Sequence, residues 1–434
     1  MSSASVGIDV GGTFTDLVAV DDAGSIRALK VPSTPGDQSE AVATALAAAT
    51  AHGQEVSRFV HGTTVATNML LERTGARVAF VTTAGFTDLL HLARQDRASL
   101  YDLTRHHPPP LVPRDRTIGA RERIAPEGVH LALDDSALKE VIAGLRAMQP
   151  DVVAVSLLHA NADASHERRL GAAITAALPD ADVVLSSDVF PEIREYERSA
   201  TTVAEGYLRP GVARYLERLT ARAAEQGVPA PGVMTSGGGM RTVADASRSA
   251  ASLALSGPAG GIVGAAAALR AAGFSDALTV DIGGTSADVG LIIGGEPLVE
   301  PGGRIAGVPI ALPRVLVETV SAGGGSIGWV DDGSALRVGP HSAGAVPGPA
   351  AFGRGGTLPT VTDAHVVLGH ISASALSGGV ELHPAAARAA LESLASTLGA
   401  PAERVARAML EIADASVARA LRRVSVERGV DPRG

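Results

Sequence analysis

The chain has 434 residues, of which 46% are hydrophobic and 19% charged, a composition sufficient for a buried core in two or three domains. Its formal charge of −9, from 37 basic and 46 acidic residues, argues against non-specific binding to nucleic acid. The sequence contains no cysteine, which excludes disulfides, thiolate metal ligands and a cysteine nucleophile.

The N-terminal segment, MSSASVGIDVGG, lacks the basic stretch and the long apolar run of a secretion signal. No run of about 18 apolar residues, the length needed to cross a membrane as a helix, occurs in the sequence. We therefore expect a soluble cytoplasmic protein that binds neither membranes nor nucleic acid.

The first half of the sequence predicts alternating strands and helices. Strands are expected at residues 6–10, 14–20, 26–31, 77–82 and 152–158, and helices at 39–51, 136–148 and 166–177. The proline-rich segment 106–113 is expected to be a loop. This alternation is typical of an α/β architecture.

The second half begins with a long apolar-periodic segment, residues 196–223, which predicts one helix or two helices separated at Pro210-Gly211. A short strand is expected at residues 232–235, and an alanine-rich helix follows Ser256 as far as about residue 272. From residue 281 to about residue 356 the abundance of glycine predicts tight turns and loops. Two helices divided near Gly399 are expected in residues 384–428.

An internal repeat is the most informative feature of the sequence. The segment VGIDVGGTFTDLV at residues 6–18 recurs as LTVDIGGTSADVG at residues 278–290. Each copy predicts a strand, the pattern D-x-G-G-T-x-x-D and a second strand. The separation is too long for a solenoid and fits a duplicated domain with one copy in each lobe.

The spacing of the repeat suits phosphate binding. An aspartate at the end of a strand, Asp9 or Asp281, can face Mg²⁺ through water, and the glycines let backbone N–H groups approach phosphate oxygens. The alternative is that each copy is only a tight hairpin, with Asp16 and Asp288 fixing the turn. The paired copies resemble the two phosphate hairpins of the actin, Hsp70 and sugar-kinase superfamily.

Further segments resemble the hydantoinase A/5-oxoprolinase family. They keep their order along nearly the whole chain and comprise residues 60–69, 156–170, 187–211, 235–241, 255–266, 320–334, 338–357 and 359–370, together with Arg94-Gln95. The resemblance implies an α/β, two-lobed actin-like ATPase fold of duplicated ribonuclease H-like domains, with a nucleotide cleft between the lobes. It assigns residues 1–190 to an N-terminal hydantoinase/oxoprolinase domain and residues 191–434 to a hydantoinase A domain.

The resemblance also implies site residues. Asp9 and Asp281 are expected to organise Mg²⁺ through water and, with His61, to be catalytic. The residues expected to bind the phosphates of ATP are Gly11, Gly12, Thr13, Thr15, Gly283, Gly284, Thr285, Ser256, Gly257, Gly260 and Gly261.

For several of these residues a structural role is an equally good interpretation. His61 either donates to a developing oxyanion or holds a turn, and the glycines after Ser256 either bind an anion or allow close packing of a helix. Arg94 is more simply explained by a salt bridge than by substrate binding. Asp363 and His365 are too few to define a metal site.

The activity implied by the resemblance is ATP-dependent hydrolysis of a cyclic amide, such as a hydantoin, 5-oxoproline or a lactam, by phosphorylation of the amide oxygen. It implies a hydantoinase B-like partner and therefore a hetero-oligomer. The alternatives are a subunit of an ATP-dependent carboxylase of the acetone or acetophenone type, or a non-enzymatic nucleotide-dependent reactivase. The sequence ends at VERGVDPRG, where family members continue into FGGAGP, so we expect the second domain to be incomplete.

Overall fold

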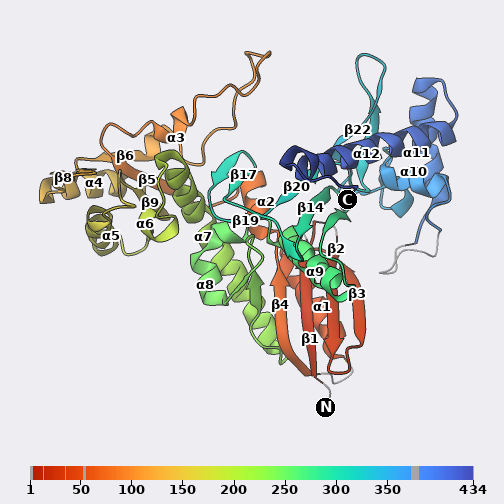
Figure 1. Cartoon of the computed structure of the whole chain (residues 1–434), viewed down its shortest axis with the longest axis horizontal. Coiled ribbons are helices and arrows are strands. Elements are labelled where there is room, and N and C mark those ends of the chain that lie inside the picture. The colour runs from red at the N-terminus through yellow and green to blue at the C-terminus, as the bar shows by residue number, and fades with distance from the viewer. Residues whose placement is uncertain (1–2, 13, 35, 52–54, 373–380, 434) are drawn as a thin grey trace.

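The structure is a computed structural model that describes residues 3–433 except residues 13, 35, 52–54 and 373–380. It confirms the expected α/β class and two-lobed arrangement (Figure 1). The N-terminal sheet and a second, smaller sheet lie next to each other at the middle of the molecule, and a separate α/β unit lies to one side. Within the described residues every helix is too short or too polar to cross a membrane.

The N-terminal sheet has six strands in the order β12-β11-β4-β1-β2-β3. Their bounds are β1 Ser3–Val10, β2 Phe14–Asp21, β3 Ile26–Pro32, β4 Glu55–Gly62, β11 Gly232–Met234 and β12 Met240–Arg241. Every second residue of β1 is buried, as expected of a strand with one face on a core, and helix α1 (Gln38–Thr50) packs on this sheet. Because β11 and β12 come from beyond residue 191, this sheet is shared by both predicted domains, and the boundary at residue 190 stays a prediction.

The α/β unit contains four parallel strands in the order β10-β9-β5-β6, on the left of Figure 1. The strands are β5 Val78–Thr83, β6 Thr117–Ala120, β9 Val152–Ser156 and β10 Asp182–Leu185; the helices are α3 Leu89–Leu92, α4 Asp135–Met148, α5 Ser165–Ala177 and α6 Ser186–Val189. A hairpin of β7 (Arg123–Ala125) and β8 (Gly128–Leu131) and a short 3-10 turn at Arg114–Arg116 complete it. The strands predicted at 77–82 and 152–158 and the helices predicted at 136–148 and 166–177 are confirmed within a few residues.

A single helix, α7 (Glu195–Glu225), occupies the segment for which one or two helices were predicted. Pro210 lies inside it and removes one backbone hydrogen bond, yet the helix continues. The burial of Tyr207, Leu208 and Val212 on either side of the proline explains this continuity, because packing of the apolar face outweighs the lost bond. Helices α2 (Val65–Glu72) and α8 (Val243–Arg248) pack against α7, as does the 3-10 turn Ala250–Leu253.

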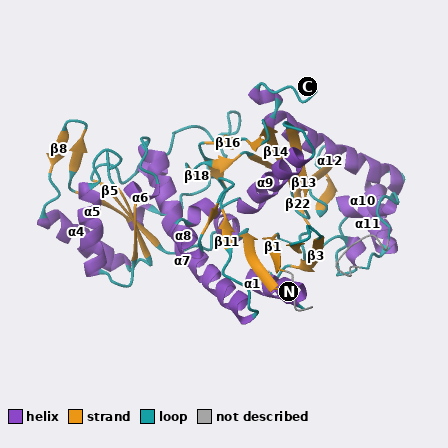
Figure 2. Ribbon diagram, turned by 60° about the horizontal axis from the view of Figure 1, so that its bottom comes forward, coloured by secondary structure: helices purple, strands orange, loops and turns teal. Residues whose placement is uncertain are grey.

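The second lobe carries helix α9 (Ser256–Ala271) and a sheet of four strands, β13 Ala277–Ile282, β14 Ala287–Ile293, β15 Glu296–Pro297 and β20 Val317–Val320. Short hairpins fill the glycine-rich region, as predicted: β16 Val299–Glu300 with β19 Arg314–Val315, β17 Gly303–Ile305 with β18 Val308–Ile310, and β21 Ser326–Val330 with β22 Leu336–Ser342. In both ribbon views this lobe lies beside the ends of the N-terminal strands (Figures 1 and 2).

The C-terminal region is helical, with α10 Val361–Val367, α11 Pro384–Leu398 and α12 Ala402–Val424, flanked by the 3-10 turns Ala350–Phe352 and Val426–Arg428. The break predicted at Gly399 is confirmed, because this residue has φ 61° and ends α11 in the left-handed conformation that glycine adopts without steric cost. Helix α12 packs on β14 and β20 and so joins the helical region to the second sheet.

Candidate phosphate-binding site

The two copies of the repeat form matching β-hairpins. Asp9 is paired across the first hairpin with Asp16, and Asp281 is paired across the second with Asp288, so each copy holds its two carboxylates at the same register position. The turns also match: the amide of Gly11 donates to Phe14 O at 2.9 Å, and the amide of Gly283 donates to Ser286 O at 2.9 Å. The structure thus confirms that the sequence repeat is a structural repeat.

The site around Asp9 is built from three segments that are distant in sequence. A Cβ atom at Gly62, the last residue of β4, would lie 2.7 Å from Asp9 Oδ1, and a Cβ atom at Gly257, in the first turn of α9, would lie 2.8 Å from it. Glycine is therefore required at both positions for this carboxylate to keep its place. Helix α9 thereby places its N-terminal turn, with its unpaired N–H groups, beside the first hairpin.

The pKa of Asp9 depends on charges from both hairpins. Its side chain is exposed to solvent but surrounded by protein on several sides, and this partial desolvation is the main reason why its pKa rises to about 6. The charges of Asp16, Asp281 and Asp288 raise the pKa further, so the other three aspartates of the repeat all act on the Asp9 carboxylate. A set of carboxylates that repel one another is stabilised by a bound cation.

The neighbours of the outer aspartates differ between the two hairpins. Lys30, one of two lysines in the chain, forms an ion pair with Asp16 across β2 and β3, with 2.5 Å between Nζ and Oδ1. Thr319 on β20 instead donates its hydroxyl to Asp288 at 2.6 Å. Burial is the main cause that raises the pKa of Asp288, and the Thr319 hydrogen bond opposes it. Asp16 and Asp288 are thus engaged by their own lobes, whereas Asp9 and Asp281 are exposed.

A glycine loop that sequence reasoning did not assign supports the second hairpin. The amide of Gly324 donates to Gly283 O at 3.0 Å, and the amide of Gly325 donates to Gly284 O at 2.6 Å. A Cβ atom at Gly323 would lie 2.5 Å from the backbone nitrogen of Ser286, so no side chain fits there. The signal in the sequence is the run of three glycines, Gly323-Gly324-Gly325, within residues 320–334.

His61 lies beneath this site and is fully buried. Its Nδ1 donates to the carbonyl oxygen of Ile8 at 3.2 Å, because a carbonyl can only accept, and its Nε2 then accepts from the Tyr215 hydroxyl at 2.7 Å. Burial lowers the pKa of His61 to about 4, so the ring is neutral at physiological pH. This geometry favours the structural interpretation, and the catalytic role of His61 stays a prediction.

Replacement of Tyr215 by phenylalanine tests the structural interpretation. The substitution leaves Nε2 of His61 buried without a partner, which costs about 1–3 kcal/mol. We therefore expect Tyr215→Phe to lower the free energy of unfolding by about that amount while ATP turnover by the assembled enzyme changes less than about threefold. Urea unfolding and a phosphate-release assay measure the two quantities, and a large loss of turnover with unchanged stability would contradict the structural role.

The predicted phosphate-binding residues fall into two groups. The exposed ones are Gly12, Gly261, Gly283, Gly284 and Thr285, and the partly buried ones are Gly11, Gly257 and Gly260. Thr15 and Ser256 are fully buried and their hydroxyls are already engaged. Thr15 Oγ1 lies 3.0 Å from Ser33 Oγ, whereas the Ser256 hydroxyl donates to Thr63 O at 3.0 Å. Their predicted contact with phosphate is therefore not available in this conformation, and Thr13 lies outside the described residues.

Comparison with known protein families identifies the family of the chain. Residues 198–434 match the Hydantoinase/oxoprolinase family, and residues 5–178 match the Hydantoinase/oxoprolinase N-terminal region. The chain belongs to the hydantoinase/oxoprolinase family.

The chain is similar to several enzymes and enzyme subunits. The alpha subunit of a caprolactamase from Pseudomonas jessenii is 40% identical over 99% of the chain and 64% of its own length. The gamma subunit of an acetophenone carboxylase from Aromatoleum aromaticum is 33% identical over 99% of the chain and 62% of its own length. A 5-oxoprolinase from Arabidopsis thaliana is 32% identical over 97% of the chain and 37% of its own length. The chain thus spans about two thirds or less of these relatives.

Two solved structures share the fold. The crystal structure of an ATP-dependent caprolactamase from Pseudomonas jessenii aligns with a TM-score of 0.84 and 38% identity, over 99% of the chain and 64% of the other protein. A nucleotide-free acetone carboxylase aligns with a TM-score of 0.85 and 28% identity, over 100% of the chain and 64% of the other protein. The expected family and fold are therefore confirmed.

Arg94 and Asp363, two other candidate residues from the sequence, have structural partners. Arg94 pairs with Glu197 through two hydrogen bonds, its Nε donating to Oε1 at 2.8 Å, as its simpler interpretation predicts. Asp363 is buried and completes a capping box with Thr360, its carboxylate also accepting from the amides of Ala350 and Ala351. Asp363 is thereby fully engaged in holding the start of α10.

Proposed function

We propose that this chain binds MgATP between its two hairpins and phosphorylates the oxygen of a cyclic amide, acting with a hydantoinase B-like partner in a hetero-oligomer. The observation that carries the proposal is the convergence of both repeat hairpins and the N-terminus of α9 on Asp9. The relatives that include a caprolactamase subunit and a 5-oxoprolinase support this substrate class.

The residues present fit a magnesium nucleotide. Asp9 and Asp281 are exposed carboxylates within electrostatic range of each other, and the glycines leave room beside them. No group of three or more acidic, histidine or cysteine side chains within the described residues forms a metal cage. This agrees with Mg²⁺, which is commonly held by one or two carboxylates, water and substrate phosphates. Bound Mg²⁺ would neutralise the charge that develops on the transferring phosphoryl group.

Phosphorylation explains how an unstrained amide becomes reactive. Transfer of the γ-phosphoryl group to the amide oxygen releases ADP and makes the ring carbon more electrophilic toward water. Water would add to this carbon, and the ring C–N bond would break as the nitrogen takes up a proton. A second water would then hydrolyse the resulting acyl phosphate to the carboxylate and inorganic phosphate. The chain would contribute mainly position and charge: Asp9 and Asp281 would orient the cation, and the exposed Gly12 and Gly284 would let the phosphates approach the backbone of the two turns, whereas the amide of Gly283 is already bonded to Ser286 O.

A carboxylase subunit is the second candidate, because the acetophenone and acetone carboxylases are also relatives. In that reaction the phosphorylated species would be an enol or carboxyphosphate, and bicarbonate would be required. The same hairpins would hold the nucleotide in both cases, so the choice depends on the substrate and the partner.

Substrate-dependent nucleotide turnover tests the proposal. The chain, co-purified with a hydantoinase B-like subunit, would be assayed for phosphate release with hydantoin, 5-oxoproline and ε-caprolactam, and with acetone and acetophenone with or without bicarbonate. We expect one cyclic amide to give ring-opened product and phosphate in equal amounts. Turnover that needs both a ketone and bicarbonate would establish the carboxylase instead, and no turnover with any compound would refute both candidates.

A further inference from the structure

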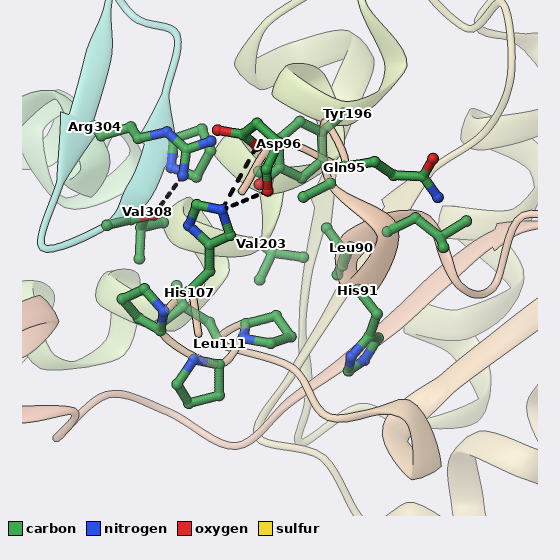
Figure 3. A pocket seen from close by; sticks show the side chains of 18 residues that line it. Leu90, His91, Gln95, Asp96, His107, Leu111, Tyr196, Val203, Arg304 and Val308 are labelled. Carbon is green, nitrogen blue, oxygen red and sulfur yellow. Dashed lines mark hydrogen bonds and ion pairs between the residues drawn. The ribbon is translucent and has the colours of Figure 1, made fainter. Parts of the chain in front are cut away.

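A cavity lies away from the hairpins, where the α/β unit meets α7 and the β17–β18 hairpin (Figure 3). Its volume is about 390 Å³, within the range of small-molecule pockets. The walls are mainly apolar and include Leu90, Leu111, Val203, Val308 and the consecutive prolines Pro108, Pro109 and Pro110. A cavity with such walls favours a ligand with an apolar body.

Three polar groups at this cavity lack a matching partner within the described residues. Arg304 forms no ion pair there, and its guanidinium makes only a 3.4 Å hydrogen bond to Gly307 O. Nε2 of His91 is buried and has no hydrogen-bond partner. Tyr196 is nearly buried, and burial raises the pKa of its hydroxyl, which therefore remains a proton donor at neutral pH.

The charged side chains that line the cavity are Arg304 and Asp96. Asp96 is the acidic residue among the described lining residues, and it is next to His107, whose Nε2 lies 2.9 Å from the Asp96 carbonyl oxygen and 3.7 Å from Oδ1 (Figure 3). Arg94, which lies over the Tyr196 ring, is already neutralised by Glu197. Arg304 therefore remains as the cation without a carboxylate.

The part of the cavity wall formed by residues 93–95 has an uncommon backbone conformation. Ala93 has φ 48° and ψ −131°, and Gln95 has φ 53°, although neither residue is glycine. Such positions cost free energy and cluster at ligand-binding sites, where the surrounding structure holds them. The strained residues flank Arg94, so its pair with Glu197 on α7 holds this wall against the helix.

This cavity is separate from the proposed phosphate site. Val203 lines the cavity, whereas Tyr215, on the same helix, contacts His61 beneath Asp9. The two positions on α7 are about 18 Å apart at the rise of 1.5 Å per residue. The cavity and the Asp9 site therefore lie against different parts of α7.

We propose that this cavity is a second binding site, specific for a small organic carboxylate with an apolar chain or ring. Arg304 would bind the carboxylate, the Tyr196 hydroxyl would donate a further hydrogen bond, and the leucine, valine and proline side chains would enclose the apolar part, with His91 on the opposite side of the cavity (Figure 3). Binding of this carboxylate would require neither nucleotide nor turnover, so the proposal does not rest on the proposed activity.

Calorimetric titration of the full chain with sodium pentanoate tests the proposal, with pentanamide and inorganic phosphate as comparisons. We expect saturable binding of pentanoate at one site, and binding at least about tenfold weaker for the neutral amide and for phosphate, which lack the charge and the apolar chain respectively. Arg304→Gln should weaken pentanoate binding about tenfold, and Val203→Phe should abolish it by filling the cavity.

Arg388→Gln is the matched control, since Arg388 is an exposed arginine on α11 that pairs with Glu403. Ala200→Leu is a second variant that reduces the cavity volume, by a smaller side chain than phenylalanine. Circular dichroism checks the fold of each variant. Absence of saturable binding, equal affinity for pentanamide, or unchanged affinity in Arg304→Gln would each overturn the assignment. If neither cavity-filling variant folds, the ligand comparison and the Arg304→Gln variant still decide.

Discussion

Asp9→Asn and Asp281→Asn are each expected to lower ATP turnover by the assembled enzyme at least about 100-fold, because each removes a charge that would orient Mg²⁺. The amide is nearly isosteric with the carboxylate, so the fold should remain intact. A phosphate-release assay over a range of Mg²⁺ concentrations measures the effect. Undiminished turnover in both variants would refute the site.

Asp9→Asn should also raise the melting temperature in the absence of Mg²⁺. The native pKa of Asp9, about 6, lies above the ordinary value of 3.8, so ionisation of this group opposes folding once the pH exceeds 3.8. The gain in melting temperature from the neutral amide should therefore grow between pH 4 and pH 6 and stay constant above pH 6. Ser57→Ala, an exposed change on β4, provides the control, for which no such pH dependence is expected.

Gly257→Ala is expected to reduce ATP turnover about 100-fold, because the new methyl group would lie 2.8 Å from Asp9 Oδ1 and would displace the carboxylate. The contact involves the end of a side chain, which can rotate away, so the melting temperature should change little. Gly62→Ala meets the same oxygen at 2.7 Å from β4 and should have a similar effect. Steady-state kinetics and thermal melts measure the two quantities.

Gly264→Ala is the matched control for Gly257→Ala, since both glycines lie on α9 and Gly264 is not among the predicted phosphate-binding residues. A Cβ atom at Gly264 meets nothing within 4 Å, and alanine is the better helix former. We expect unchanged turnover and a slight gain in stability. If Gly257→Ala and Gly264→Ala behave alike, the close approach of α9 to Asp9 does not matter for activity.

Local pattern was sufficient to predict the hairpins and most helices. The repeated D-x-G-G-T-x-x-D segment places turn residues, strand residues and carboxylates within a few positions of each other, so its conformation depends little on the rest of the chain. Helix α9 and the break at Gly399 were predicted for the same reason. The order of the family segments along the chain then indicated how these local elements combine.

Contacts distant in sequence were not predictable from the same patterns. The burial of His61 depends on Tyr215, and that of Ser256 depends on Thr63, and neither pair has a signature in sequence spacing. Packing also kept α7 continuous through Pro210, against its local preference. The support of the second hairpin by Gly323 is a further example, because a glycine required by close approach resembles a glycine in any turn.

The shared N-terminal sheet has a consequence for synthesis of the protein. Strand β11 pairs in parallel with β4, although 169 residues separate Gly62 from Gly232, and Tyr215 of α7 contacts His61 of β4. The sheet therefore remains incomplete on the ribosome until translation has passed residue 241, and the early strands leave an open edge at β4 for that time. A fragment ending at residue 190 would keep that edge permanently, which makes it prone to aggregation when expressed alone.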